Sequence, residues 1–237
     1  MPQGSAGSAK VTRGPVHHPL FARYYAKVSV GAETRMGMGR VRDRLLAGLS
    51  GRVIEIGAGN GLNFAHYPRT VAEVVAIEPE SLLRQLAVEA ALRAEVPVDV
   101  APGAAEALPV KSEAFDAAVL CLVLCSVRDV RRALGEVRRV LRPGGVVRFF
   151  EHGQGGGSAM TFTQHALDRT LWPPLNGGCH LAREPIAAFR EAGFELGPYR
   201  RLLMPEKGPR LPTSYCVLGT AWRPAETSEV KEPATGP

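Results

Sequence analysis

The sequence predicts an α/β fold in which a doubly wound, mostly parallel sheet of seven strands carries helices on both faces. After Gly51, short apolar runs alternate with segments of helical periodicity, which is the order of parallel strands joined by helices. Several of these runs are apolar throughout, as strands buried on both faces are. The last run, "SYCVLGTAW", is followed by no helix, and we expect it to close the sheet from one edge.

The individual elements follow from the apolar runs and from the turn residues between them. "VLRPGGVV" predicts a helix end followed by a Pro-Gly-Gly turn into the next strand. The expected strands lie near residues 52–57, 73–78, 97–101, 115–121, 145–151, 194–201 and 214–221. The expected helices lie near residues 61–66, 80–93, 128–141 and 184–192, with one or two more between residues 20 and 49.

Composition limits the class of protein. The 237 residues are 45% apolar and 22% charged, which is typical of a soluble globular protein of about one domain. The longest apolar run, residues 117–125, is far shorter than the ~20 residues of a membrane span, and the first residues form no apolar signal. Four cysteines without disulfide spacing suit a reducing compartment. We therefore expect a cytoplasmic protein without a transmembrane segment.

The positive charge is concentrated at one end of the chain. Residues 1–50 contain eight Lys or Arg against two acidic residues, which accounts for the whole net charge of +6. The segment is either an arginine-rich solvated helix or a surface for an anion, a membrane surface or nucleic acid. No interleaving of aromatic and basic residues supports nucleic acid as a partner. Peripheral membrane contact stays an alternative, and no pattern indicates an oligomeric state.

A glycine-rich loop follows the first expected strand, in "VIEIGAGNGLNF" at residues 53–64. Glycine tolerates a positive φ and lets backbone N–H groups approach a ligand directly. The spacing is G-x-G-x-G, with Leu62 where a dinucleotide fingerprint has its third glycine, and no phosphate loop of the G-x-x-x-x-G-K-[ST] type is present. Alone, such a loop is equally well a tight connection between a strand and a helix.

Two acidic residues sharpen the interpretation of this loop. Glu55 lies two residues before Gly57, where a carboxylate repels a pyrophosphate but suits a ligand that carries an ammonium group and a sulfonium. Glu78 ends the second strand, 21 residues after Gly57, where a carboxylate can accept hydrogen bonds from both hydroxyls of a ribose. The loop and both acids together predict a site for a positively charged nucleoside.

These residues carry a family resemblance. The series "VIEIGAGNG", "AIEPE", "GAAEALPV", "FDAAVLCLVLCSV" and "LRPGG" resembles the class I S-adenosylmethionine-dependent methyltransferases over residues 50–222. The resemblance implies a Rossmann-like sheet with an antiparallel last strand and S-adenosyl-L-methionine as cofactor. It implies that Glu55 and the loop bind the methionine portion, Glu78 the ribose, and that Ala105 and Glu106 flank the adenine. The implied cofactor-binding set is Glu55, Gly57, Ala58, Gly59, Asn60, Gly61, Glu78, Pro79, Ala105, Glu106, Cys121 and Leu122.

A narrower resemblance concerns the acceptor. "LVLCSV", "EH" at residues 151–152, Gln164 with Asp168, and "GCHLARE" at residues 178–184 resemble the methyltransferase-like branch that includes thiol methyltransferases. This resemblance implies a small, partly apolar acceptor, with a thiol slightly favoured over oxygen, nitrogen or carbon acceptors. No appended recognition domain indicates a protein or nucleic-acid substrate.

The long connection after the fifth strand, residues 152–182, is the expected substrate lid, because connections of this length are more often functional than idle. Glycines at 153–157 would form its hinge. The alternative is a surface excursion with one short helix. The side chains expected to line a substrate pocket are Tyr25 from the N-terminal helix and Phe162 and Trp172 from the lid, with Tyr24, Met160 and Leu171 as neighbours.

Candidate catalytic groups lie where the fifth strand ends. We expect Glu151 or His152 to assist deprotonation of the acceptor or to orient it, with Asp168 on the lid as a further candidate. The alternative is that Glu151 and His152 merely cap the strand or bind each other. Methyl transfer from a sulfonium depends mainly on positioning and exclusion of water, and a thiol with a pKa of about 8–9 needs little help from a base.

No metal site is expected. Cys121 and Cys125 form a Cys-x₃-Cys pair without a matched second pair, and the adjacency of Cys179 and His180 is weak evidence for a metal or for covalent catalysis. Buried free cysteines behave as small apolar residues.

The expected organisation is one domain with a disordered end on each side. The parts are a disordered segment 1–18, a domain 19–222 and a disordered tail 223–237; the domain consists of a helical cap (19–49), a cofactor-binding core (50–151), the lid (152–182) and a C-terminal helix with strands (183–222). The leading hypothesis is a methyltransferase, and the alternatives are a non-catalytic cofactor-binding module and a dinucleotide oxidoreductase.

Overall fold

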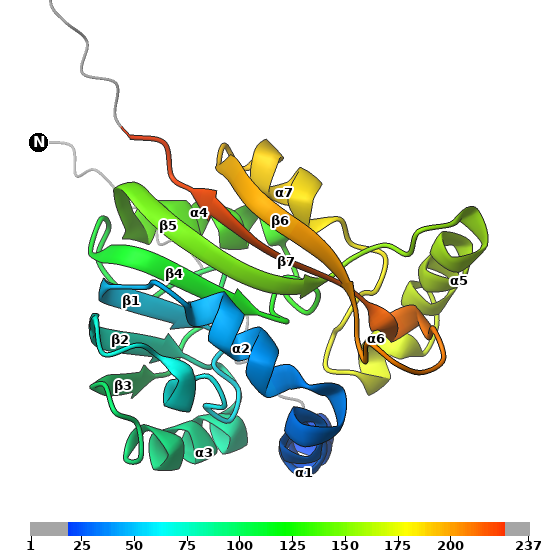
Figure 1. Ribbon diagram of the computed structural model, residues 1–237, viewed down its shortest axis with the longest axis horizontal. Helices are drawn as coiled ribbons and strands as arrows, with labels where there is room; N and C mark the ends of the chain where they lie inside the picture. Colours follow the sequence, from blue (N-terminus) through cyan, green and yellow to red (C-terminus); the bar gives the residue numbers. More distant parts are fainter. Residues whose placement is uncertain (1–18, 226–237) are drawn as a thin grey trace, which may run out of the picture.

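The computed structural model describes residues 19–225, so the segment 1–18 and the tail beyond residue 225 lie outside the described residues. Seven strands form one sheet in the order β3-β2-β1-β4-β5-β7-β6 (Figure 1). The strands are β1 (Gly51–Ile56), β2 (Val71–Ile77), β3 (Val98–Ala101), β4 (Phe115–Cys121), β5 (Leu141–His152), β6 (Glu195–Leu203) and β7 (Tyr215–Trp222).

The strand directions confirm the predicted mostly parallel sheet. The pairs among β1 to β5 are parallel, whereas β7 runs antiparallel to both β5 and β6. The expectation that the last strand lies at an edge is wrong, because β7 lies between β5 and β6. The apolar strand β7 is largely buried, while β6 exposes Arg200 and Arg201 and suits the edge position.

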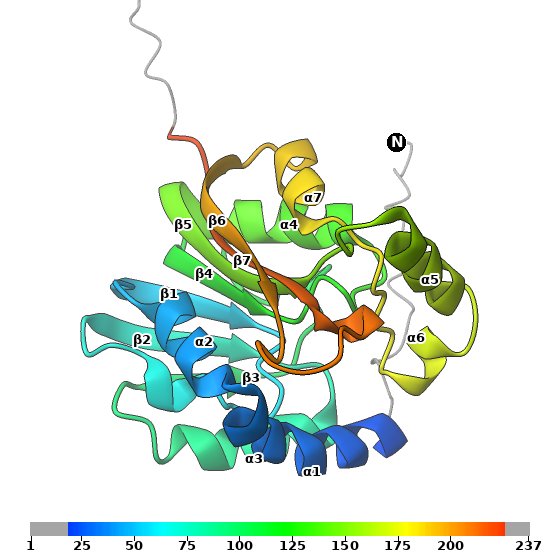
Figure 2. The same cartoon turned by 45° about the vertical axis from the view of Figure 1, so that its right-hand side comes forward.

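Helices cover both faces of the sheet (Figures 1 and 2). One core joins the sheet to α4 and α7 through Leu134, Val137 and Phe189, and the other joins it to α2 and α3 through Leu45 and Ala87. The helices are α1 (Pro19–Met36), α2 (Met38–Leu46), α3 (Ser81–Ala91), α4 (Val130–Val140), α5 (Ser158–Asp168), α6 (Trp172–Leu175) and α7 (Pro185–Glu191), with short 3₁₀ turns η1 (Phe64–His66) and η2 (Pro212–Ser214).

The structure differs from the sequence-based expectation in three segments. The helix expected near residues 61–66 is only the turn η1, because left-handed glycines precede it and Pro68 follows it closely. The Pro-Gly-Gly segment belongs to β5, which begins at Leu141 and shifts register against β4 after Phe115. The long connection after β5, the expected lid, contains two helices, α5 and α6, whereas the alternative of a surface excursion had one short helix.

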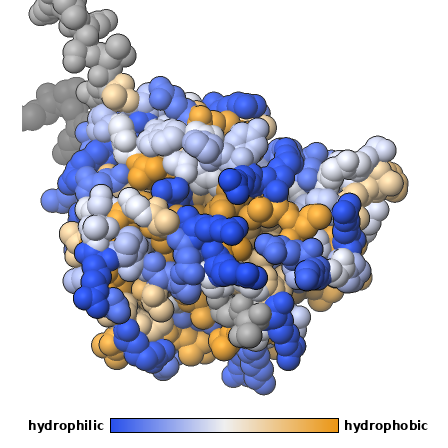
Figure 3. Space-filling view, viewed as in Figure 1, coloured by the Kyte–Doolittle hydropathy of each residue, from blue (hydrophilic) through white to orange (hydrophobic). Residues whose placement is uncertain are grey.

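Helices α1, α5 and α6 lie beyond the carboxyl ends of the parallel strands, at the right-hand side of Figure 1. Apolar residues reach the surface at the same end (Figure 3), where Phe162 of α5 is 75% exposed and Leu175 of α6 is 68% exposed. Among the described helices, none combines the length and the apolar character that crossing a membrane requires. At the opposite end, Arg223, which the sequence assigns to the disordered tail, donates hydrogen bonds to Glu113 and to the Leu141 carbonyl.

Candidate functional site

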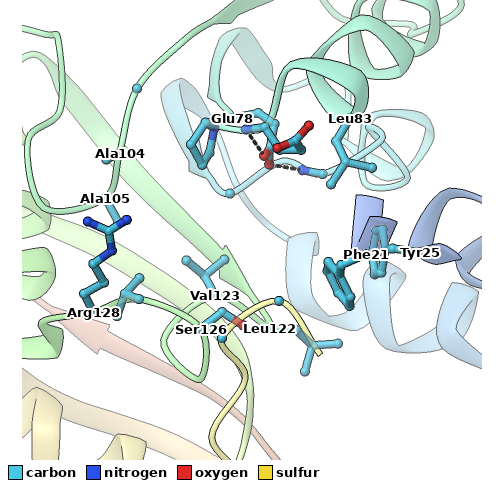
Figure 4. Close-up of a pocket in the computed structure, with 18 of the residues that line it drawn as sticks. Phe21, Tyr25, Glu78, Leu83, Ala104, Ala105, Leu122, Val123, Ser126 and Arg128 are labelled. Carbon is cyan, nitrogen blue, oxygen red and sulfur yellow. Dashed lines mark hydrogen bonds between the residues drawn. The ribbon is translucent and has the colours of Figure 1, made fainter. Parts of the chain in front are cut away.

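A pocket of about 380 Å³ lies at the carboxyl ends of β1, β2, β3 and β4 (Figure 4). It sits where the strand order reverses between β1 and β4, the position at which open α/β sheets bind ligands. Each of the four strands contributes the loop that follows it, and α1, Leu83 of α3 and the loop after α6 contribute the remaining wall. The pocket is therefore assembled from segments distributed over most of the chain.

Glycine is required for different structural reasons at the three glycine positions of the first loop. Gly57 has φ +68°, and a Cβ there would lie 2.8 Å from a methyl carbon of Val123. Gly59 also has a positive φ and lines the pocket beside Tyr25. Gly61 does not line the pocket; a Cβ there would lie 2.7 Å from both Ala90 and the Phe64 ring. Gly57 and Gly59 thus expose their backbone to the pocket, and Gly61 permits close packing against α3.

Glu78 is the acidic side chain that reaches the pocket from the end of β2 (Figure 4). One carboxylate oxygen accepts a hydrogen bond from the Gly59 N–H at 2.8 Å, and the other accepts one from the Glu80 N–H at 2.8 Å. Burial raises the pKa of Glu78 to about 7. The carboxylate couples the first glycine loop to the loop after β2, and both loops face the same space.

Glu55 lies beneath the glycine loop and does not line the pocket. The residue is 2% exposed, and its carboxylate accepts hydrogen bonds from Asn63 Nδ2 at 2.8 Å and from the Tyr67 hydroxyl at 2.7 Å. Arg42 donates to Asn63 Oδ1 at 2.5 Å and adds a buried positive charge. Burial raises the pKa of Glu55 to about 7. The expected direct contact between Glu55 and a ligand is replaced here by a network that supports the loop.

The loop after β3 and the turn after β4 form the facing wall. Ala105 and Glu106 both line the pocket, and the Glu106 carboxylate accepts a hydrogen bond from the Arg128 N–H at 2.8 Å. Leu122 follows β4 with φ +59°, a left-handed conformation that costs energy in a residue with a Cβ and that directs its side chain to the pocket wall. Cys121, which the family resemblance places in the cofactor-binding set beside Leu122, does not line the pocket and accepts a hydrogen bond from Arg42.

Aromatic residues of α1 close the pocket on another side (Figure 4). Tyr25 and Phe21 both line it, with ring centroids 5.7 Å apart. The sequence analysis named Tyr25 and missed Phe21, although the two lie four residues apart and therefore on one helical face. Gly177 approaches Phe21 so closely that a Cβ would lie 2.5 Å from the ring.

The lid residues singled out from the sequence do not line the pocket. Phe162 points to solvent, and Trp172 packs against a small cluster with Cys125, Cys179 and Leu181. From the segment 152–182, the residues that line the pocket are Gly177 and Gly178. Their position depends on how the loop after α6 returns to the sheet, which no local pattern indicates.

None of the three candidate catalytic groups lines the pocket, and two of them, Glu151 and Asp168, hold backbone turns. Glu151 is fully buried, and one of its carboxylate oxygens accepts hydrogen bonds from the Val123 and Leu124 N–H groups at 2.9 and 3.0 Å. Asp168 accepts from the N–H groups of residues 181 and 182 at 2.7 and 2.9 Å. His152 Nδ1 lies 3.5 Å from the sulfur of Cys179. None of the three lines the pocket, so this geometry supports positioning roles.

The predicted residues therefore fall into two groups. The structure brings together around one pocket Gly57, Gly59, Glu78, Pro79, Ala105, Glu106, Leu122 and Tyr25. It places outside the pocket lining Glu55, Ala58, Asn60, Gly61, Cys121, Glu151, His152, Phe162, Asp168 and Trp172. Among the second group, Asn60 donates to the Ser29 hydroxyl at 3.1 Å and so connects the glycine loop to α1. Lining residues that sequence reasoning missed include Phe21, Leu83, Ser126, Arg128 and Gly177.

This arrangement suits a nucleoside ligand. Bare backbone at Gly57 and Gly59, a carboxylate at Glu78 and apolar side chains at Leu83 and Val123 face one space. Carboxylate oxygens accept hydrogen bonds from ribose hydroxyls, and apolar walls bury the base. The residues present therefore fit an adenosine group.

Comparison with known proteins identifies the family. The family described as "Methyltransferase domain" matches residues 54–149. The thiol S-methyltransferase TMT1B of Homo sapiens is 35% identical over 183 residues, which cover 74% of this chain and 73% of that protein. The chain belongs to the class I S-adenosylmethionine-dependent methyltransferases. S-adenosyl-L-methionine is accordingly the cofactor of this methyltransferase.

Two further comparisons extend this result. The ubiquinone/menaquinone biosynthesis C-methyltransferase UbiE of Syntrophotalea carbinolica is 31% identical over 170 residues, 67% of this chain and 70% of that protein. A solved structure of a SAM-dependent methyltransferase from Thermotoga maritima, described as a possible histamine N-methyltransferase, superposes with a TM-score of 0.62 at 23% identity over 86% of this chain and 98% of that one. The family membership overturns both alternatives, the non-catalytic module and the dinucleotide oxidoreductase.

Proposed function

We propose that this methyltransferase transfers the methyl group of S-adenosyl-L-methionine to the sulfur of a small, partly apolar thiol. The observation that carries the proposal is the 35% identity to a thiol S-methyltransferase over about three quarters of both chains. The pocket is consistent with it, because apolar residues such as Leu122, Val123 and Phe21 line the space beside the cofactor loops.

Different residues of the pocket would bind different parts of the cofactor. Glu78 would accept hydrogen bonds from the ribose, the backbone at Gly57 and Gly59 would face the methionine portion, and Leu83 and Ala105 would enclose the adenine. When bound, the cofactor supplies a methyl group that its sulfonium already activates. Phe21 and Tyr25 line the pocket and would exclude water from it when the cofactor is bound.

A thiol acceptor fits a pocket whose described lining contains neither histidine nor aspartate and whose glutamates follow β2 and β3 rather than β4. A thiol has a pKa of about 8–9, so a useful fraction is ionised near neutral pH without a protein base. The attack then depends on holding the sulfur in line with the methyl group, which shape and exclusion of water accomplish. Glu151 contributes indirectly, because it fixes the turn that presents Leu122 and Val123.

A second candidate is methylation of a ring carbon in a quinone-type acceptor. The 31% identity to a C-methyltransferase of ubiquinone and menaquinone biosynthesis favours it. Such an acceptor is also small and largely apolar, so the two candidates differ in the atom methylated rather than in the character of the pocket.

The test is a product assay on the full chain with labelled S-adenosyl-L-methionine and a panel of alkyl thiols, aryl thiols, phenols, amines and quinols. We expect methyl thioethers from the apolar thiols and little product from the matched alcohols. Transfer to quinols but not to thiols would replace the first candidate by the second. A Glu78→Gln variant serves as the control, because its lower activity must come with weaker cofactor binding.

A further inference from the structure

Three side chains with metal-ligating atoms meet beside the cofactor pocket. Cys125 lies in the turn after β4, His152 ends β5, and Cys179 lies in the loop after α6. Their sulfur and ring-nitrogen atoms all lie within 4.8 Å of one another, and Cys179 Sγ is 3.5 Å from His152 Nδ1. The residues are distant in sequence, so only the fold brings them together.

The spacing suits a tetrahedral zinc ion. With Zn–S bonds of about 2.3 Å and Zn–N bonds of about 2.0–2.1 Å, a tetrahedron places a sulfur and a nitrogen ligand about 3.5 Å apart. Two thiolates and an imidazole are soft and borderline ligands, which select zinc over magnesium or calcium. The sequence-based expectation of no metal rested on the lack of paired local motifs, and a site made from three separate segments produces no such motif.

The surroundings hold the three ligands in place. The His180 N–H donates to the Cys125 carbonyl at 2.7 Å, and Arg183 donates to the Leu124 carbonyl. Asp168 fixes the backbone just after Cys179 through its two hydrogen bonds. Preformed ligand geometry of this kind lowers the cost of ordering the site when a metal binds.

The local charges also favour a cation. The carboxylates of Glu151 and Asp168 both interact electrostatically with His152. The guanidinium of Arg183 acts in the opposite direction and interacts with both sulfurs. The two thiolates that a bound metal requires carry two negative charges against this single positive charge, so a divalent ion is compatible with the cluster.

Of the three cluster residues, His152 also borders a second pocket. This pocket of about 160 Å³ is lined by His152, Leu124 and Arg183. Within the described residues, the cluster offers three protein ligands. Zinc sites with three protein ligands keep a water molecule or an exogenous donor in the fourth position.

We propose that Cys125, His152 and Cys179 bind one Zn²⁺, with both thiols releasing their protons to solvent and the fourth position left to water or a small donor. The ion would tie the turn 122–128 to the loop 176–181. These two segments form one wall of the cofactor pocket, since Ser126 and Gly178 line it and the His180 N–H donates to the Cys125 carbonyl. The metal would therefore stabilise the cofactor site.

The test is metal analysis of the full chain, purified reduced and without a histidine tag, then incubated with Zn²⁺ and desalted. We expect one zinc per chain by elemental analysis, and a sulfur-to-metal charge-transfer absorption when Co²⁺ is used instead. Loss of a side chain that only hydrogen-bonds a metal ligand weakens metal binding about 10- to 100-fold. Cys125→Ser and Cys179→Ser each remove a ligand itself and should weaken zinc binding by more than that. His152→Gln should do the same.

Matched controls separate the site from adventitious binding. Cys216→Ser alters a buried cysteine outside the cluster, and His165→Gln alters an exposed histidine on α5, so both should retain one zinc. Folding of every variant is checked by circular dichroism. A reduced wild-type protein that retains no zinc, or a folded Cys125→Ser/Cys179→Ser double variant that retains it fully, would overturn the proposal. A wild-type chain in which Cys125 and Cys179 form a disulfide after reductive purification would also overturn it.

A second readout concerns the cofactor pocket. Because zinc binds the folded chain, it should raise the thermal midpoint of the wild-type protein but not of the double variant. Removal of the ion with a chelator should weaken binding of S-adenosylhomocysteine to the wild type and leave the affinity of the double variant unchanged. Equal affinities in the zinc-loaded and chelated wild type would refute the proposed link between the two loops.

Discussion

Two buried carboxylates near the glycine loop have similar environments and different tasks. Burial raises the pKa of both Glu55 and Glu78 to about 7, yet only Glu78 lines the pocket. The alternation of side chains along β1 explains the difference, because Glu55 shares a face with Val53, which packs in the core beneath α2. The acid that a linear motif places at the mouth of the loop therefore lies under it.

Replacement of Glu78 by glutamine tests its contact with the ribose. Loss of hydrogen bonds to a charged acceptor costs about 1.5–3 kcal/mol, so S-adenosylhomocysteine should bind about 10- to 150-fold more weakly to Glu78→Gln. Bound hydroxyls favour the ionised carboxylate, so wild-type affinity should rise as pH increases through about 7. Calorimetry between pH 6 and pH 8.5 checks both effects.

The matched control is Glu89→Gln, an exposed position on α3. Its affinity should follow that of the wild type at every pH. A Glu78→Gln variant whose affinity retains the full wild-type rise with pH would show that another group controls binding.

Some individual residues of the site could be predicted from the sequence, and others could not. Gly57, Gly59 and Glu78 follow strands whose position in the fold is readable from apolar runs, and the structure places them in the pocket. Tyr67 and Arg42, the partners of the buried network, were unreadable because they reach Glu55 and Asn63 through tertiary packing. The sequence treated Arg42 as part of a solvated basic segment, although it falls on the buried face of α2.

At the scale of elements, α1 and the loops after β4 and α6 decide how the pocket closes. Helix α1 packs on α2 and α3 and presents Phe21 and Tyr25 to the pocket. The turn after β4 is fixed by Glu151, and the loop after α6 is fixed by Asp168. The charged groups act on backbone N–H groups of these elements, while the pocket wall itself is mainly apolar.

The contribution of α1 can be measured with Phe21→Ala. Removal of one aromatic wall should cost about 0.5–1.5 kcal/mol of cofactor binding, which is about a 2- to 12-fold increase in Kd. Tyr24→Ala is the control, because Tyr24 lies on the same helix and is 60% exposed. If both variants bind S-adenosylhomocysteine equally, α1 does not close the pocket in solution.

The role of Asp168 distinguishes positioning from acid–base catalysis. Asparagine offers one acceptor oxygen where Asp168 satisfies two N–H groups, so Asp168→Asn should lose about 1–3 kcal/mol of unfolding free energy. Chemical denaturation measures this loss. The pH profile of kcat should keep its shape in the variant. If Asp168 were instead a catalytic base, its replacement would remove the acidic limb of the profile and leave the free energy of unfolding nearly unchanged.

At the scale of the whole molecule, the strand and helix pattern was sufficient for the fold class but not for the order of the last strands. Strands β1 to β5 follow from mostly apolar runs, with helix α3 between β2 and β3 and helix α4 between β4 and β5. The insertion of β7 between β5 and β6 depends on long-range pairing, such as Phe150 with Leu218, which neighbouring residues do not encode. The same limit applies to the cluster of Cys125, His152 and Cys179, since its members lie on three separate segments.

Buried carboxylates also give the whole molecule a pH-dependent stability. Glu55, Glu78 and Glu151 each have a pKa raised to about 7 by burial. Between their unfolded and folded pKa values the folded chain binds more protons than the unfolded chain. The free energy of unfolding should therefore fall as pH rises from about 5 to about 8, and ionisation of one such group costs on the order of 2 kcal/mol over that range.

Glu55→Gln isolates one of these contributions. The glutamine oxygen can accept from Asn63 while its amide group donates to the Tyr67 oxygen, so the network survives without a titrating group. Urea denaturation at several pH values should show a shallower decline in the free energy of unfolding for Glu55→Gln than for the wild type. Glu195→Gln, at an exposed position on β6, should decline as the wild type does. Parallel curves for Glu55→Gln and the wild type would mean that Glu55 is already ionised throughout, with its charge balanced by Arg42.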